Sequence, residues 1–236
     1  METNVSTVIV VTGASRGIGK AIALSLATPD TALIINCSKS AGRLELVKEE
    51  IIKKGALCET FVGDVSNYST VNEMFDLAIS TYGKVNILIN NAGIASIGLF
   101  QDMTPDMWNN IMSVNLNSVY NCCHFAVQDM LRRHCGKIIN ISSVWGLYGA
   151  SCEVAYSATK GAINSFTKAL AKELAPSNIQ VNAIACGAID TEMNGHLSPE
   201  ELEELAEEIP CGTLGSPCGV ANLVKLILNS DNYLTG

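Results

Sequence analysis

A short apolar run that passes directly into a glycine-rich turn constrains the fold of this chain more than any other feature. Residues Ser6–Val11 are mostly β-branched and almost wholly apolar, as in strands buried on both faces of a parallel sheet. Glycines follow at positions 13, 17 and 19, and a helical pattern then runs from Lys20 to Ala27. Between a strand and a helix, such glycines allow a tight turn and let a phosphate approach the N–H groups of the helix N-terminus. An ordinary turn can have the same composition, so this stretch alone leaves a phosphate site and a plain turn both open.

The alternation of apolar runs and helical patterns continues along the chain. Further strands are expected at Ala32–Cys37, Leu57–Val62, Asn86–Asn90, Lys137–Ile141 and Ile179–Ala185, with helical patterns between them. This order predicts a Rossmann-type, doubly wound parallel sheet of six strands with helices on both faces, a three-layer α/β/α arrangement. Ligands of such a sheet bind beyond the carboxyl ends of the strands. The sequence contains no interdomain linker, so we expect a single domain over residues 1–236.

The composition disfavours several classes of function. The chain has 236 residues, of which 48% are apolar and 16% charged, and its net charge is −8. The acidic excess is concentrated in Pro199–Glu208 and no basic patch is present, which disfavours binding to nucleic acid. No segment has the roughly 18 apolar residues of a membrane span. The first residues, Met1–Asn4, lack the features of a signal peptide.

Nine cysteines are scattered along the chain without any C-x-x-C pair. An odd, dispersed set indicates reduced thiols that serve mostly as small core residues. The close Cys/His groupings, Cys122-Cys123-His124 and His134-Cys135, lack the spacing of a metal site, so no metal is expected. Reduced thiols and the absence of a membrane segment together predict a cytoplasmic protein.

One expected helix carries the residues best suited to proton transfer. Tyr156 and Lys160 lie four residues apart, so they share one face of a helix that is expected from about Glu153 to Leu174, before Pro176. An ammonium beside a phenol favours the phenolate and lowers the tyrosine pKa from about 10 toward neutrality. Such a phenol can exchange a proton with a carbonyl or alcohol oxygen. Taken alone, Tyr-x-x-x-Lys more often marks a half-buried tyrosine with an exposed lysine, and only the preceding motifs change that interpretation.

Five motifs occur in order along the chain: Thr12-Gly-x-x-x-Gly-x-Gly19, Asn90-Asn-Ala-Gly93, Asn115, Ser143 and Tyr156-x-x-x-Lys160. Each is weak alone, but the set closely resembles the short-chain dehydrogenase/reductase superfamily over essentially the whole chain. Within it, the chain looks most like bacterial 3-oxoacyl-[acyl-carrier-protein] reductases, which belong to fatty acid biosynthesis. Three stretches also resemble a branch that includes the reductases acting on 5-aminopentanone-modified elongation factor P: Ser142-Ser-Val-Trp-Gly146, Gly149-Ala-Ser-Cys-Glu-Val154 and Ile209-Pro-Cys-Gly212.

The resemblance implies roles for the matching residues. Tyr156 would be the general acid in reduction of a ketone, Lys160 would lower its pKa and hold the nicotinamide ribose, and Ser143 would orient the carbonyl. Asn115 would hold a water that links Lys160 to a proton relay. The cofactor would contact Tyr156 and Lys160 and also Gly13, Ser15, Arg16, Gly17, Ile18, Gly19, Ser38, Lys39, Asp64, Val65, Asn91, Ala92, Gly93, Gly187, Ile189 and Thr191. The implied partners are a small-molecule or carrier-linked ketone and further copies of the chain, in a homodimer or homotetramer.

The end of the second expected strand bears on the choice of cofactor. It reads Asn36-Cys37-Ser38-Lys39 and offers no carboxylate to hold a ribose 2′-hydroxyl. Lys39 and Arg16 could instead face a 2′-phosphate, which favours NADP(H) over NAD(H). Alternatively, Lys39 is only a solvated loop charge.

Two departures from the family pattern stand out. The family usually has Pro-Gly after the sixth strand, whereas this chain has Cys186-Gly187, which removes a fixed φ and places a thiol near the cofactor. The sequence ends at Thr235-Gly236, where the family normally continues through a seventh strand and a tail that supports the tetramer. A truncated seventh strand is expected to weaken assembly or to expose a strand edge.

The acidic region Met193–Glu208, with a helix start at Ser198, corresponds to a mobile substrate lid in the family, here at about residues 190–212. Its acidity suits a cationic amine better than an anionic carrier protein, although a plain solvated helix face would look the same. Three functions therefore remain open: reduction of a 3-oxoacyl thioester, reduction of another ketone such as a protein-borne aminopentanone, and non-catalytic binding of NADP by a regulatory protein. The complete Asn/Ser/Tyr/Lys set argues against the third.

Overall fold

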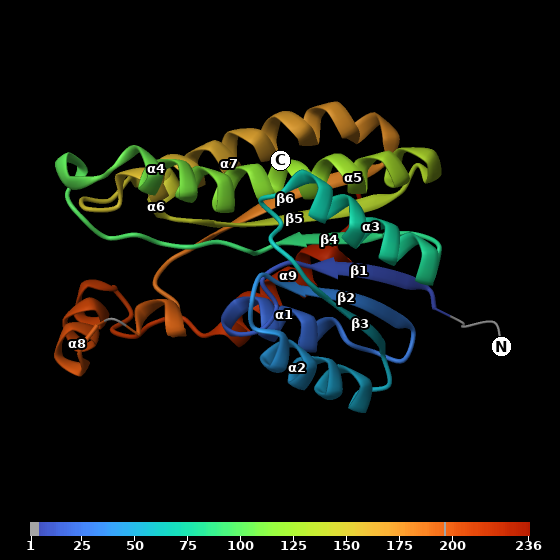
Figure 1. The fold of residues 1–236 in the computed structure, drawn as a ribbon, viewed down its shortest axis with the longest axis horizontal. Helices are drawn as coiled ribbons and strands as arrows, with labels where there is room; N and C mark the ends of the chain where they lie inside the picture. The colour runs from blue at the N-terminus through green and yellow to red at the C-terminus, as the bar shows by residue number, and fades with distance from the viewer. Residues whose placement is uncertain (1–4, 196) are drawn as a thin grey trace.

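The computed structural model describes residues 5–195 and 197–236 (Figure 1). The expectation about Met1–Asn4, and the part of the expected lid at His196, lie outside the described residues. Six strands form one parallel sheet in the order β3-β2-β1-β4-β5-β6, so the predicted doubly wound sheet is confirmed. The strands are β1 (Thr7–Val11), β2 (Thr31–Cys37), β3 (Leu57–Val62), β4 (Ile87–Asn90), β5 (Gly136–Ser143) and β6 (Ile179–Cys186).

Helices cover both faces of this sheet and enclose two apolar cores (Figure 1). One core lies under α1 (Gly17–Leu26), α2 (Ala41–Lys53) and α9 (Pro217–Asn229). The other lies under α3 (Tyr68–Tyr82), α5 (Ser118–Arg133) and α7 (Val154–Leu174). All seven residues of β2 are buried, as expected for a strand with helices on both sides.

The helical segment between β4 and β5 is not one regular helix. It consists of α4 (Pro105–Met112), a π-helical turn at Ser113–Asn117, and α5. Its start is capped, because the Thr104 hydroxyl accepts a hydrogen bond from the Met107 N–H at 3.2 Å. The wider π-helical turn contains Asn115, and asparagine is unfavourable inside a regular α-helix.

Further short elements lie near the carboxyl edge of the sheet. The sequence did not indicate α6 (Trp145–Tyr148) or α9, whereas α8 (Pro199–Glu208) starts at Ser198 as predicted, with a capping box closed by Glu201. In Figure 1, α8 stands apart from the body of the domain. Three 3₁₀ turns complete the described elements: η1 (Phe100–Asp102), η3 (Ala175–Ser177) and η4 (Glu192–Asn194).

The outer edge of β6 is not bare, contrary to the expected exposed edge. Gly236 N–H donates to the Val181 carbonyl at 2.9 Å, and the Asn182 amide donates to the Leu234 carbonyl at 3.0 Å. The Thr235 hydroxyl accepts from the Val181 N–H at 3.0 Å. These last residues therefore cover the edge, although they are not assigned as a seventh strand.

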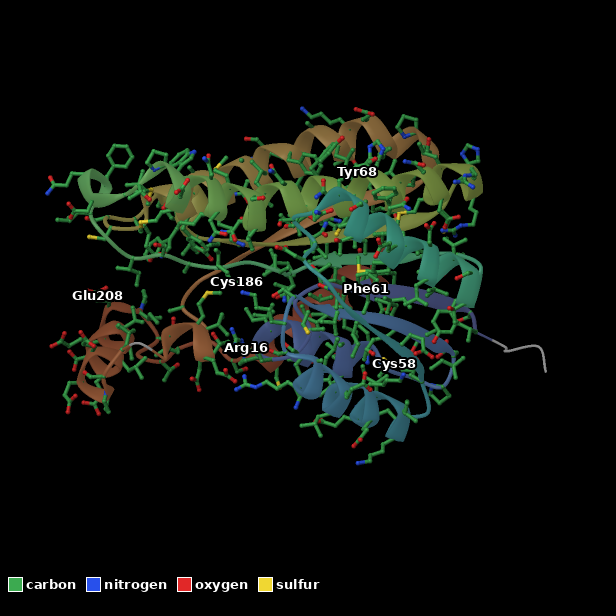
Figure 2. The ribbon with its side chains drawn as sticks, viewed as in Figure 1. Arg16, Cys58, Phe61, Tyr68, Cys186 and Glu208 are labelled. Atoms are coloured by element: carbon green, nitrogen blue, oxygen red, sulfur yellow. The ribbon has the colours of Figure 1, made fainter. Side chains whose placement is uncertain are left out.

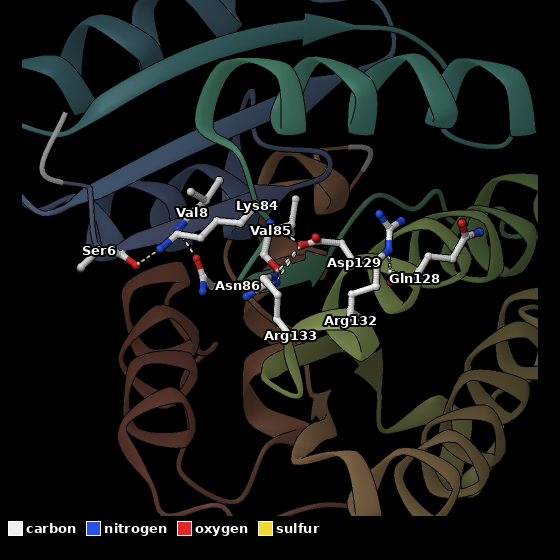
Figure 3. Close-up of polar contacts among 9 residues, drawn as sticks. All are labelled: Ser6, Val8, Lys84, Val85, Asn86, Gln128, Asp129, Arg132 and Arg133. Carbon is white, nitrogen blue, oxygen red and sulfur yellow. Dashed lines mark hydrogen bonds and ion pairs between the residues drawn. The ribbon is translucent and has the colours of Figure 1, made fainter. Parts of the chain in front are cut away.

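Polar contacts fix the amino end of β4, at the opposite edge of the sheet from the carboxyl ends of the strands (Figure 3). The Asp129 carboxylate accepts hydrogen bonds from the Val85 N–H at 2.9 Å and from Arg133 at 2.8 Å. The Asn86 side chain accepts one from the Val8 N–H at 2.8 Å. Together these bonds tie α5, β4 and β1 to one another. Within the described ranges, no helix is both long and apolar enough to span a membrane.

Candidate active site

The turn between β1 and α1 requires its glycines. Gly13 and Gly17 have φ values of +64° and +54°, in the left-handed region that favours glycine. A Cβ on Gly19 would collide with the Gly13 carbonyl oxygen. The backbone is thus packed too closely for side chains, as a cradle for a phosphate group requires.

This turn is braced by the loop that follows β4. The Thr12 hydroxyl accepts hydrogen bonds from the N–H groups of Asn91 and Ala92, at 3.0 and 3.1 Å. The Asn91 side chain donates to the carbonyls of Thr12 and Gly13, at 3.0 and 3.1 Å. The two loops therefore form one rigid unit at the carboxyl edge of the sheet.

Tyr156, Lys160 and Ser143 meet in one cavity of about 290 Å³. Tyr156 and Lys160 come from the first turns of α7, and Ser143 is the last residue of β5. Lys160 is 5% exposed, and its Nζ lies 5.4 Å from the centroid of the Tyr156 ring and donates to the Ile141 carbonyl at 2.9 Å. The Ser143 hydroxyl accepts from the Trp145 N–H at 3.2 Å and also hydrogen-bonds with Tyr156.

Burial is the largest influence on the pKa values of Tyr156 and Lys160. It raises the pKa of Tyr156 to about 12, although a hydrogen bond with Ser143 acts in the opposite direction. It lowers the pKa of Lys160 to about 8, which the nearby Cys186 thiol opposes. The prediction that Lys160 brings the Tyr156 pKa toward neutrality is therefore wrong for this structure. The reason is that the phenol itself is desolvated, which disfavours its charged form more than its neighbours stabilise it.

Asn115 lies behind the cavity and is fully buried. Its side chain accepts from the Ile94 N–H at 2.8 Å and donates to the Ile94 carbonyl at 2.9 Å, with a further contact to Thr159 at 3.3 Å. A Cβ on Gly93 would stand 3.3 Å from the Asn115 side-chain oxygen and 3.8 Å from the Lys160 Nζ. The glycine at position 93, which has no side chain, therefore lies close to both Asn115 and the Lys160 ammonium.

A second cavity of about 280 Å³ lies beside the glycine-rich turn. Arg16 lines this cavity, and a second guanidinium comes from Arg43, in the first turn of α2. Glu192 pairs with both, at 3.3 Å to Arg16 and 2.7 Å to Arg43. Lys39 is exposed and does not line this cavity. The sequence did not indicate Arg43 or Glu192, because no motif relates their positions.

The remaining predicted cofactor residues fall into three groups. Six line the first cavity: Ile18, Asn91, Gly93, Gly187, Ile189 and Thr191. Ser15 and Gly17 line the second. Ser38, Asp64, Val65 and Ala92 follow the ends of β2, β3 and β4 and line neither cavity.

Several residues that the sequence did not mark also line the first cavity. Among them are the apolar residues Ile97, Trp145, Leu197 and Leu205, and the acidic residue Glu153. The Cys186 thiol lies on the same wall, and burial raises its pKa, so the replacement of the usual proline adds a thiol that stays protonated (Figure 2).

Comparison with known proteins identifies the family. The model of the short chain dehydrogenase family matches residues 7–202. The chain belongs to the short-chain dehydrogenase family. It is therefore an oxidoreductase that uses a nicotinamide cofactor, as the sequence motifs predicted.

Similar members of the short-chain dehydrogenase family are 3-oxoacyl-[acyl-carrier-protein] reductases. The one from Aquifex aeolicus is 40% identical over 231 residues, which cover 97% of this chain and 93% of the relative. The one from Staphylococcus aureus (strain Mu50) is 38% identical over 227 residues, 96% of this chain and 92% of the relative. The crystal structure of the Brucella melitensis enzyme of that name aligns with a TM-score of 0.89 and 33% identity, over 99% of this chain and 88% of that one.

Proposed function

We propose that this protein is an NADPH-dependent reductase that converts a 3-oxoacyl thioester, carried by acyl carrier protein, to the 3-hydroxyacyl thioester. The observation that carries the proposal is the convergence of Tyr156, Lys160 and Ser143 on one cavity, beside the glycine-rich turn. The names of the similar proteins support the choice of substrate.

The residues present fit a nicotinamide dinucleotide. Gly13 and Gly19 provide a turn without side chains, and Gly93 leaves space in front of Lys160. The end of β2 has no carboxylate to hold a ribose 2′-hydroxyl, which favours a cofactor with a 2′-phosphate. Arg16 and Arg43 provide the positive charge that would bind this phosphate. When bound, the cofactor supplies the hydride.

Tyr156 is the proposed proton donor to the ketone oxygen. With a pKa of about 12 its phenol is protonated at neutral pH, which suits donation to an oxygen that gains negative charge. Ser143 lines the same cavity and hydrogen-bonds with Tyr156, and with a ketone bound its hydroxyl would donate to the same oxygen. This arrangement favours reduction of the ketone over oxidation of the alcohol near neutral pH.

Lys160 and Asn115 would form part of a proton relay that returns a proton to Tyr156. Lys160 is mostly protonated at neutral pH, because its pKa is about 8. Its ammonium would hydrogen-bond the nicotinamide ribose, and a water held by Asn115 would link it to a relay. The short distances from position 93 to both side chains support this role.

The wall of the first cavity supports an acyl substrate. Ile97, Trp145, Leu197 and Leu205 provide apolar contacts for a hydrocarbon chain. We also propose that residues 190–212 act as a lid over this substrate, because Leu197 and Leu205 reach the cavity from that segment.

A second candidate substrate is a ketone with a cationic amine, such as the 5-aminopentanone modification of elongation factor P. Glu153 lines the cavity and its charge acts on Tyr156, so the negative charge near the proposed proton donor favours a cation. The six glutamates of α8, of which Figure 2 labels Glu208, belong to the helix whose Leu205 lines the same cavity. Their charge would repel an anionic carrier protein.

The proposal includes assembly into a homodimer or homotetramer in the cytoplasm, in fatty acid biosynthesis. Tyr120 and Leu131 on α5 are 50% and 39% exposed, and such apolar surface supports pairing of this helix between copies.

The deciding experiment follows NADPH absorbance with acetoacetyl-acyl-carrier protein, an acetoacetyl thioester of coenzyme A, an amino ketone and no substrate, with NADH in parallel. The proposal predicts the highest kcat/KM for the carrier-linked ketone with NADPH. Preference for the amino ketone would favour the second candidate. Cofactor binding without turnover of any ketone would favour a regulatory protein and refute both.

A further inference from the structure

Two guanidinium groups from different helices share one carboxylate. Arg16 directly precedes α1, Arg43 lies in the first turn of α2, and Glu192 is the first residue of η4. The Arg43 Nη1 donates to Glu192 Oε1 at 3.1 Å and to Oε2 at 2.7 Å. The Arg16 Nη1 donates to the same Oε2 at 3.3 Å. The pair thus already holds an anion through two of its oxygens, which is how guanidinium groups also hold phosphate.

These contacts lie next to the turn that would hold the cofactor. Ser15 and Gly17 of the glycine-rich turn line the same cavity as the two arginines. At the end of β2, the Asn36 side chain donates to the Phe61 and Gly63 carbonyls, at 3.1 and 3.0 Å. These bonds occupy the amide nitrogen of Asn36, and no carboxylate stands at the end of β2 to hold a ribose 2′-hydroxyl, so the cavity suits a nucleotide with a 2′-phosphate.

Replacing the ion pairs of Glu192 with Arg16 and Arg43 by contacts to another anion would cost the protein little stability. The side chains of Arg16, Arg43 and Glu192 are 59%, 53% and 55% exposed, and ion pairs with such exposure contribute little to stability. The other carboxylate on this cavity, Glu50, is paired with Lys20 at 2.8 Å. A phosphate carries more negative charge than a carboxylate, so it would compete well for the two arginines.

The segment that carries Glu192 also borders the first cavity. Thr191, Met193 and Asn194 line the cavity of Tyr156 and Lys160, whereas Glu192 between them lines the second cavity. Figure 2 shows Arg16 near the place where this segment approaches α1. A change at Glu192 therefore reaches the wall of the proposed catalytic cavity through adjacent residues.

We propose that Glu192 occupies the place of a nucleotide 2′-phosphate on Arg16 and Arg43, and that binding of this phosphate releases the segment that carries Glu192, residues 191–195, from these two arginines. Glu192 is then a competitor of the phosphate, and Arg43, rather than Lys39, is its second cation. The phosphate of the cofactor and the position of the segment over the substrate are coupled through one side chain. This inference rests on the proposed use of NADP(H).

The test uses nucleotides without a nicotinamide, so it does not depend on catalysis. Calorimetry compares the binding of adenosine 2′,5′-bisphosphate with that of ADP. Glu192→Gln should tighten binding of the bisphosphate by about two- to fivefold and leave ADP unchanged. Arg43→Ala should weaken binding of the bisphosphate by about tenfold and leave ADP unchanged. The matched control is Glu203→Gln on α8, which removes the same charge from the same segment and should change neither affinity.

Amide hydrogen exchange supplies an independent readout of release. The bisphosphate should speed exchange in residues 191–195 of the wild-type protein, where Gly195 N–H donates to the Glu192 carbonyl at 3.2 Å, and ADP should not. If Glu192→Gln weakens or leaves unchanged the binding of the bisphosphate, or if exchange does not respond to it, the competition is refuted while the use of NADP(H) stands. If the wild-type protein does not prefer the bisphosphate to ADP, the use of NADP(H) fails, and this inference fails with it.

Discussion

The buried ammonium of Lys160 makes a sharp prediction about stability and pH. Its ordinary pKa of 10.5 falls to about 8 in the folded protein because the charged form is desolvated. The unfolded chain therefore binds more protons than the folded protein between about pH 8 and 10.5, and the contribution of this group to stability rises with pH in that window. Below pH 8 the full cost of burying the charge remains, on the order of 3 kcal/mol from the difference of the two values.

The substitution Lys160→Met isolates the contribution of the Lys160 charge to the unfolding free energy. Methionine keeps most of the side-chain volume and cannot be charged, but it leaves the Ile141 carbonyl without its donor. That loss does not depend on pH, so the informative quantity is how the difference in unfolding free energy between the two proteins changes with pH. From about pH 7 to about pH 9.5, the wild-type protein should gain about 2 kcal/mol relative to the variant.

Urea denaturation at these two pH values, at one fixed protein concentration, measures the difference. All other titrating groups are common to both proteins and cancel to first order. A difference that stays constant between the two pH values would mean that Lys160 titrates normally, and the account of its burial would be wrong.

Three further predictions concern the site and its turn. If the charge on Lys160 supports proton transfer, kcat/KM for ketone reduction should fall as pH rises through about 8; a pH–rate profile that stays flat to about pH 9 would contradict this. Gly19→Ala should abolish nucleotide binding measured by calorimetry, because its Cβ would strike a carbonyl oxygen of the same turn, whereas Gly42→Ala in α2 has open space and should bind normally. Alkylation followed by mass spectrometry should label Cys211, which is exposed and has a lowered pKa, well before Cys186, whose pKa burial raises; the reverse order would refute the burial argument.

The strands were predictable because burial on both faces leaves a continuous apolar run, as in β2. The differences arise where polar residues continue a strand. Ser142 and Ser143 belong to β5 because they pair with Ala185 and Cys186 at the carboxyl edge, where side chains point into the site rather than into a core. Likewise, only the contacts of Asn115 with a neighbouring loop show why the long helix widens there.

The candidate site also contains residues that the sequence indicated and residues that it did not. Motif spacing indicated Tyr156 and Lys160, because residues four apart on a helix must share a face. It could not indicate the contact of Arg43 with Glu192, which lie 149 residues apart in sequence and meet only through the packing of the fold. It also could not give the sign of the Tyr156 pKa shift, because desolvation depends on what surrounds the ring.

The most direct test of the proposed mechanism is the rate of NADPH oxidation with an acetoacetyl thioester by wild-type protein and by Tyr156→Phe, with NADPH binding measured for both. The variant loses only a hydroxyl group, so it should fold and bind NADPH as the wild-type protein does. Its turnover should fall by about a hundredfold to ten-thousandfold, the usual contribution of a general acid. Turnover near the wild-type rate would show that the ketone receives its proton from another group and would contradict the role given to Tyr156.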